Sequence, residues 1–135
     1  MPSFDLANTL NVQVAHPVRL VTGNTNVTAI DTAGFEGVAV AYSIGQTING
    51  NPQMNISFLV GADTNVANAS AINANFITKQ PTVINTVNTV AWAGVGILGG
   101  SESTRYIFPN IVANASNFNG VVLGILGFPH TTPTT

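Results

Sequence analysis

The sequence has no cysteine and very little charge. Only 6% of its 135 residues are Asp, Glu, Lys or Arg, and the formal net charge is −2, whereas an average soluble domain carries about 25% charged residues. Without cysteine the chain can form neither a disulfide nor a thiolate zinc site. So few basic residues also argue against binding to nucleic-acid phosphates or to an anionic membrane surface. We therefore expect no nucleic-acid partner, no membrane partner, no metal and no cofactor.

Long hydrophobic runs are also missing, although 45% of the residues are apolar and the mean hydropathy is +0.35. The longest apolar stretches, Val90–Leu98 and Val121–Phe128, are much shorter than the roughly 20 residues that a membrane-spanning helix needs. The N-terminal sequence MPSFDLANTL lacks a basic region followed by an apolar core, so it does not read as a secretory signal. We expect synthesis in a cytoplasm.

Asparagine and threonine take the place of charge and make up about a quarter of the chain. Their side chains are polar but neutral, and a partner can cover them at a lower desolvation cost than it could cover lysine or glutamate. One interpretation is a β protein with a neutral surface. The interpretation we favour is a subunit that works inside an assembly, since free monomers usually carry more charge.

Alternating bulky residues indicate strands throughout the chain. The clearest series are Val38–Ile44 and Met54–Val60, and Thr82–Trp92 is the longest β-branched run. About seven to nine short strands with turns every 8–12 residues predict an all-β fold, an antiparallel β-sandwich or barrel of jelly-roll-like type. We expect one domain, with an extended N-terminal arm at 1–10, a β core at 11–127 and an extended C-terminal tail at 128–135.

Several local features follow from the same patterns. Asn49-Gly50 and Asn119-Gly120 are typical of hairpin turns. Ile72–Thr78 reads as a strand, and Pro109 should interrupt the strand that begins near Arg105. One turn of helix could follow Gly61.

The sequence gives little support for a catalytic site. The acidic residues are far apart in the sequence, no serine lies in a nucleophile-elbow context, and Asp63-Thr64-Asn65 lacks the rest of a calcium loop. We therefore expect that the protein is not an enzyme.

The aromatic residues and one arginine are the remaining candidates for binding. Trp92, Tyr42, Tyr106 and Phe108 could form a sugar-stacking platform, but alternating strand positions favour a place in the core. In a chain with so little charge, Arg105 should have a fixed partner: a buried carboxylate, a cluster of carbonyls or a neighbouring subunit. We expect an internal salt bridge with Glu102 or Glu36, or else a contact between subunits.

Three segments resemble small head proteins of tailed bacteriophages. They read AIDTAGFEGVAVAYSIG at 29–45, SESTRYIF at 101–108 and GILGFPHTTP at 124–133. The chain is similar, in this pattern, to capsid decoration (cement) proteins. The resemblance implies a structural virion protein, made in the host cytoplasm, that binds the outer surface of an icosahedral capsid and bridges neighbouring major capsid subunits.

The resemblance also implies the partner and the binding mode. The partner would be the major capsid protein, bound by a homo-oligomer or by many copies on one shell. The candidate partner-binding residues are Phe4, Leu6, Leu10, Arg105, Phe128 and Pro129. The alternative is a carbohydrate-binding or adhesion module on a virion or cell surface, which would show Trp92 and Tyr42 exposed on one face.

Overall fold

The structure is a computed structural model and describes residues 11–129 except 34, 97–104 and 115–116. Within these residues the regular elements are nine strands and two short 3-10 helices. They are β1 (Asn11–Val21), β2 (Ile30–Asp31), β3 (Phe35–Asn49), β4 (Met54–Gly61), η1 (Val66–Asn68), β5 (Ser70–Ala71), η2 (Ala74–Phe76), β6 (Ile77–Lys79), β7 (Thr89–Gly96), β8 (Tyr106–Ala113) and β9 (Asn117–Pro129). No helix of the described part is long and apolar enough to cross a membrane.

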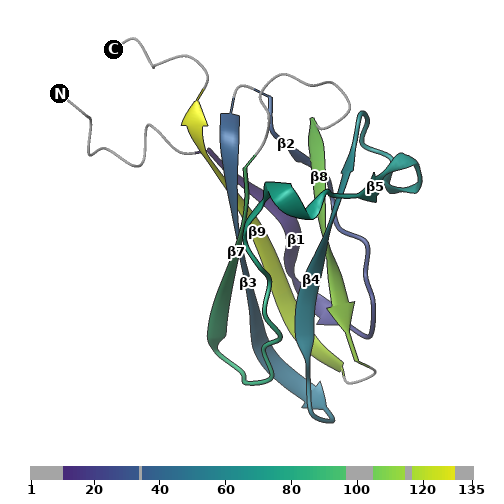
Figure 1. Cartoon of the computed structure of the whole chain (residues 1–135). Coiled ribbons are helices and arrows are strands. Elements are labelled where there is room, and N and C mark those ends of the chain that lie inside the picture. Colours follow the sequence, from purple (N-terminus) through teal and green to yellow (C-terminus); the bar gives the residue numbers. More distant parts are fainter. Residues whose placement is uncertain (1–10, 34, 97–104, 115–116, 130–135) are drawn as a thin grey trace, which may run out of the picture.

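The strands form two antiparallel sheets that pack face to face (Figure 1). The five-stranded sheet has the order β1-β9-β3-β7-β6, and the four-stranded sheet has the order β2-β8-β4-β5. With the short edge strand β6 left aside, the chain passes between the sheets in the order of a jelly roll, a double-sheet β fold. The predicted all-β sandwich of jelly-roll type is therefore confirmed, including the number of strands.

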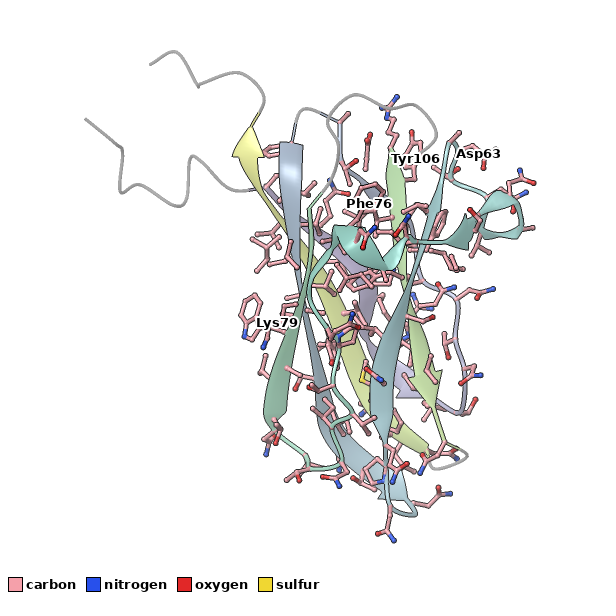
Figure 2. The ribbon with its side chains drawn as sticks, viewed as in Figure 1. Asp63, Phe76, Lys79 and Tyr106 are labelled. Carbon is pink, nitrogen blue, oxygen red and sulfur yellow. The ribbon has the colours of Figure 1, made fainter. Side chains whose placement is uncertain are left out.

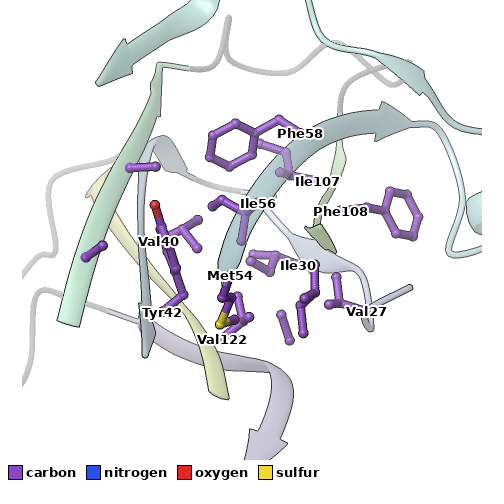
Figure 3. Packing of buried hydrophobic residues seen from close by; sticks show 14 of the residues in the cluster. Val27, Ile30, Val40, Tyr42, Met54, Ile56, Phe58, Ile107, Phe108 and Val122 are labelled. Atoms are coloured by element: carbon purple, nitrogen blue, oxygen red, sulfur yellow. The ribbon is translucent and has the colours of Figure 1, made fainter. Parts of the chain in front are cut away.

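The core lies between the sheets and is made by the inward residues of the alternating series (Figure 3). The side chains of Tyr42, Met54 and Phe108 are essentially inaccessible to solvent. Every second residue is buried from Val38 to Ile44 in β3 and from Met54 to Phe58 in β4, as the alternation predicted. Burying such side chains contributes about 1.5–3 kcal/mol each relative to exposure.

Both hairpin predictions were wrong. Asn49-Gly50 is a turn, and Gly50 takes a left-handed φ of 72°, but it joins β3 to β4, which lie in different sheets. Asn119-Gly120 lies inside β9, opposite Leu20 and Arg19. A side chain at Gly120 would meet Val21 Cγ2 at 3.1 Å, so this glycine serves close packing rather than a turn.

Two of the predicted strands were also wrong in extent. Of 72–78 only Ile77 and Thr78 are strand, at the start of β6, because Asn73 accepts a hydrogen bond from the Asn75 N–H and starts η2. The long run 82–92 is divided at Asn88, whose φ of 59° ends any extended conformation. The turn of helix expected after Gly61 is η1.

Pro109 does not interrupt β8. It lies opposite Phe58 in a continuous ladder with β4. On the other side of β8, β2 pairs only as far as Ile107, and Thr25 bridges to Ile111. The missing N–H of Pro109 therefore falls between these two contacts, where no ladder bond is lost.

Candidate interaction surface

The outer face of the five-stranded sheet is apolar. In β9 the odd-numbered residues Val121, Leu123 and Ile125 alternate with a buried series and point away from the core. In β7 the inward residues next to Trp92 are the small Ala91 and Ala93. The bulky Val90 and Trp92 of β7 therefore lie on the outside of the sheet, where an antiparallel sandwich usually has polar residues.

Strand register aligns these side chains into rows that cross the sheet. Val14 lies opposite Leu123, Leu123 opposite Ala41, and Ala41 opposite Trp92, so one row crosses four strands. Val12, Ile125 and Ala39 form the next row. We call the whole set the apolar face: Val12, Val14, Ala39, Ala41, Ser43, Val90, Trp92, Val121, Leu123 and Ile125.

The side chains at the two ends of the apolar face are widely open to solvent. Val12 and Val14 of β1 are 58% and 53% exposed, and Val90 and Trp92 of β7 are 57% and 45% exposed. None of the ten residues is charged. Large apolar side chains exposed on one face of a sheet often mark a contact with another molecule.

A lysine and a threonine border the apolar face at β6. Lys79 of β6 lies opposite Gly94, on the side of the sandwich where β7 lies (Figure 2). A side chain at Gly94 would meet Thr78 Oγ1 at 2.6 Å, so Thr78 already occupies that part of the sheet surface. The apolar face is thus bounded by β6 on one side and ends at the edge of β1 on the other.

The outer face of the four-stranded sheet is richer in polar side chains, which lie beside the exposed Val112 of β8. Asn24, Asn26, Ser57 and Asn110 line a shallow depression there. Asn110 accepts a hydrogen bond from the Val27 N–H at its Oδ1 and donates to Asn26 Oδ1. These amides fix the 22–28 segment against β8. The two outer faces of the sandwich therefore differ in chemistry, one apolar and one rich in amides.

Arg105 has an internal partner, and it is Asp31. The guanidinium Nε and Nη2 donate to the two oxygens of the Asp31 carboxylate at 2.9 Å each, and the Arg105 side chain also lies 5.1 Å from the centre of the Tyr106 ring. The hydrogen bond from Arg105 lowers the pKa of Asp31. Asp31 was not among the expected partners, because sequence spacing gave no reason to choose a carboxylate 74 positions away. Glu102 lies outside the described residues, and the side chain of Glu36 is not described. Asp31 lies opposite Tyr106, and Tyr106 lies at the end of the sandwich where β8 begins (Figure 2).

The structure describes the other predicted partner-binding residues only in part. Phe4, Leu6 and Leu10 lie outside the described residues. Phe128 and Pro129 belong to β9 by their backbone, and Pro129 lies opposite Phe35; their side chains are not described. The strand thus continues past residue 127, where we placed the end of the core.

Tyr42 and Trp92, which a sugar-binding platform would need on one face, differ in exposure to solvent. Tyr42 is buried, and its hydroxyl donates to the Thr82 carbonyl at 2.5 Å and accepts from the Thr82 N–H at 2.8 Å. Trp92, expected in the core, is exposed on the apolar face. The prediction of a core position was wrong for Trp92, because the inward positions of β7 next to it hold alanines.

No group of three or more potential metal ligands occurs in the described part of the chain.

No family model matches the chain, and no curated protein matches it in sequence. Among solved structures it is similar to the SPBc2 prophage-derived protein YomS, with 16% identity over 87% of this chain and 91% of that chain, and a TM-score of 0.54. At this identity the likeness shows a shared fold. The chain therefore has the fold of a prophage-derived protein.

Two weaker likenesses have TM-scores below 0.5. One is to the structure of the infectious bursal disease virus Gx strain, with 12% identity over 92% of this chain and a TM-score of 0.46. This chain spans about a third of that viral chain, 32% of its length. The other is to the K1 cleaved adhesin domain of Lys-gingipain from Porphyromonas gingivalis W83, with 8% identity over 86% of this chain and 72% of that chain, and a TM-score of 0.44.

Proposed function

We propose that the protein is a structural component of a phage virion that binds the outer surface of the capsid and bridges neighbouring major capsid subunits. The observation that carries the proposal is the apolar face, an uncharged surface that spans four strands and is widely exposed on β1 and β7. The shared fold with the prophage-derived protein YomS supports it. In this proposal the protein acts by binding and performs no catalysis.

The apolar face would dock on the shell through dispersion and the hydrophobic effect. Trp92, and Leu123 two strands away in the same row, supply apolar area on a rigid sheet, so little conformational entropy is lost on binding. Tryptophan is also enriched among the residues that dominate protein interfaces. On a shell with many equivalent sites, each copy needs only a modest affinity, because segments that reach a second subunit bind at high effective concentration. The arm residues Phe4, Leu6 and Leu10 and the tail residues Phe128 and Pro129 stay our candidates for that second contact.

A co-sedimentation experiment tests the docking step. Purified full-length protein is mixed with capsids of the phage whose genome encodes it, and the bound ratio to the major capsid protein is measured. We expect a fixed ratio for the native chain and a loss of binding of about tenfold or more for Val90→Lys, because the charge would be buried in an apolar contact. The matched control is Ser57→Lys, an exposed position on the opposite, more polar face. Equal binding of both variants, or no binding of the native chain, would refute the proposal.

The second candidate is carbohydrate binding, and the exposed indole of Trp92 is the observation that favours it. A sugar ring can stack on such an indole. Against it stands the burial of Tyr42, which leaves Trp92 without the predicted aromatic neighbour. A shift of tryptophan emission on addition of an oligosaccharide, lost in Trp92→Ala, would support this candidate instead.

A further inference from the structure

The four edges of the two sheets are not protected equally. Open strand edges invite pairing with other chains, and proteins usually shorten them or place charge on them. β5 and β2 have two residues each, and β6 has three and includes Lys79. β1, by contrast, is an eleven-residue edge strand.

Only the first part of β1 is open. Beyond it, the Ala15 carbonyl accepts a hydrogen bond from the Thr28 N–H at 2.9 Å, and the register with β9 shifts twice between Val14 and Arg19. Pro17 has no N–H to donate. In Asn11–Val14 the ladder with β9 is regular, and no other described residue hydrogen-bonds to the outer backbone edge of these four residues.

The side chains of this short stretch leave its outer edge clear. The Gln13 side chain is used internally: its Nε2 donates to the Asp31 carbonyl and its Oε1 accepts from the Asp31 N–H, both at 2.9 Å. Val12 and Val14 point to the outside as part of the apolar face. No charge lies between Asn11 and Val14.

We propose that the edge Asn11–Val14 pairs in antiparallel fashion with the same edge of a second copy. The sequence Val12-Gln13-Val14 reads the same in both directions, so a two-fold axis at Gln13 places each Val12 opposite the Val14 of the other copy. A two-fold axis can pair a strand with its own copy in this way, and here it brings uncharged valines opposite each other. Cross-strand pairs of β-branched residues stabilise it further.

Pairing at this edge makes one larger surface. The two five-stranded sheets become continuous, and the four valines join the apolar faces of both copies. A dimer of this kind presents two docking surfaces side by side, which is the geometry that bridging of neighbouring subunits requires. The inference goes beyond the proposed function and does not depend on it, since it is tested in solution without capsids.

Light scattering coupled to size exclusion measures the oligomeric state. We expect the native full-length chain, of 13.9 kDa, to show twice that mass at high concentration. Val12→Lys should shift the dissociation constant upward by about tenfold or more, because two lysines would be brought to the paired edge. The control is Val90→Lys, which changes an equally exposed valine at the far side of the same face and should leave the dimer intact.

The two lysine variants also separate this interface from face-to-face packing. If Val90→Lys dissociates the dimer and Val12→Lys does not, the copies associate through the apolar faces and the edge proposal is wrong. A native chain that is monomeric at every concentration also overturns the proposal. The free edge would then be available to pair with another protein or with residues 1–10.

Cysteine cross-linking tests the register, and the chain has no native cysteine to interfere. Directly opposed residues have Cα atoms about 4.5–5.5 Å apart, which a disulfide can span. A mixture of Val12→Cys and Val14→Cys proteins should therefore form a disulfide-linked heterodimer on oxidation. Each variant alone should not, because its two cysteines would be about 8 Å apart, beyond disulfide reach. Cross-linking of a single variant alone, or none in the mixture, would exclude the proposed register.

Discussion

The side chain of Ile30 in β2 packs directly on the backbone of Gly124 in β9, which lies in the other sheet. A Cβ at position 124 would meet Ile30 Cγ1 at 3.1 Å and Ile30 Cγ2 at 3.4 Å, and Ile30 itself is fully buried. This contact joins the two sheets where β9 is flanked by β1 and β3. Glycine is therefore needed at 124 for the close approach of the sheets.

Gly124→Ala should destabilise the protein by about 1–3 kcal/mol, the usual cost of overpacking a core. Urea denaturation measures the change in the free energy of unfolding. The matched control is Gly23→Ala, where an added Cβ has no neighbour within 4 Å and stability should be unchanged or slightly higher. Equal stability of the two variants would show that Ile30 moves aside freely.

Tyr42→Phe should cost about 1 kcal/mol. The Tyr42 hydroxyl makes both backbone hydrogen bonds to Thr82 and holds the segment before β7 against β3. Its removal leaves the N–H and carbonyl of Thr82 to water or to no partner. Tyr106→Phe is the control, since the Tyr106 hydroxyl has no hydrogen bond to the described residues; thermal unfolding should show a clearly smaller change for it. A larger loss for Tyr106→Phe would contradict this assignment.

Stability should fall as the pH drops below about 6.5 because of His16. The imidazole is buried, and its Nδ1 lies 3.0 Å from the Gly120 carbonyl oxygen. Burial lowers the pKa of His16 below 6.5, and nearby Arg19 lowers it further, while the Gly120 hydrogen bond opposes the change. The unfolded chain therefore binds a proton at a higher pH than the folded chain does. The stabilisation is complete above the unfolded pKa and is lost as the pH falls from there toward the folded pKa.

Urea titrations at about pH 7.5 and 5.5 measure this effect across the ordinary histidine pKa. His16→Gln should remove the pH dependence in that range, and His130→Gln, at the other histidine, should keep it. If His16→Gln does not fold, NMR titration of the native imidazole replaces it. A His16 midpoint at or above 6.5 would be inconsistent with the prediction.

Much of the fold could be predicted from the sequence, because alternation reports burial directly. Val38–Ile44 and Met54–Val60 have bulky residues on one side, and they form the inner faces of β3 and β4. The jelly-roll order was harder to predict: local turn chemistry at Asn49-Gly50 is the same whether the chain returns in its own sheet or crosses to the other. Long-range pairing decides that choice.

The apolar face could not be predicted from the sequence for a related reason. β7 is apolar on both sides, and a sequence pattern alone does not tell which side meets the core. Ala91 and Ala93 face the core, so Val90 and Trp92 are left outside. The partner of Arg105 was likewise set by the pairing of β2 with β8, which brings Asp31 opposite Tyr106. A two-residue strand has no periodicity from which this pairing could be predicted.

Trp92 should report the docking of the apolar face. It is the chain's one tryptophan, and its exposed indole should be quenched readily by acrylamide in the free protein. With 7-azatryptophan incorporated into this chain alone, its emission is separated from that of shell tryptophans. On capsids the quenching constant should fall severalfold, because the row Val14–Leu123–Ala41–Trp92 becomes covered. Val90→Lys protein, mixed with the same capsids, should stay fully quenchable. If the bound native chain is quenched as easily as the free one, it attaches to the shell through a different surface.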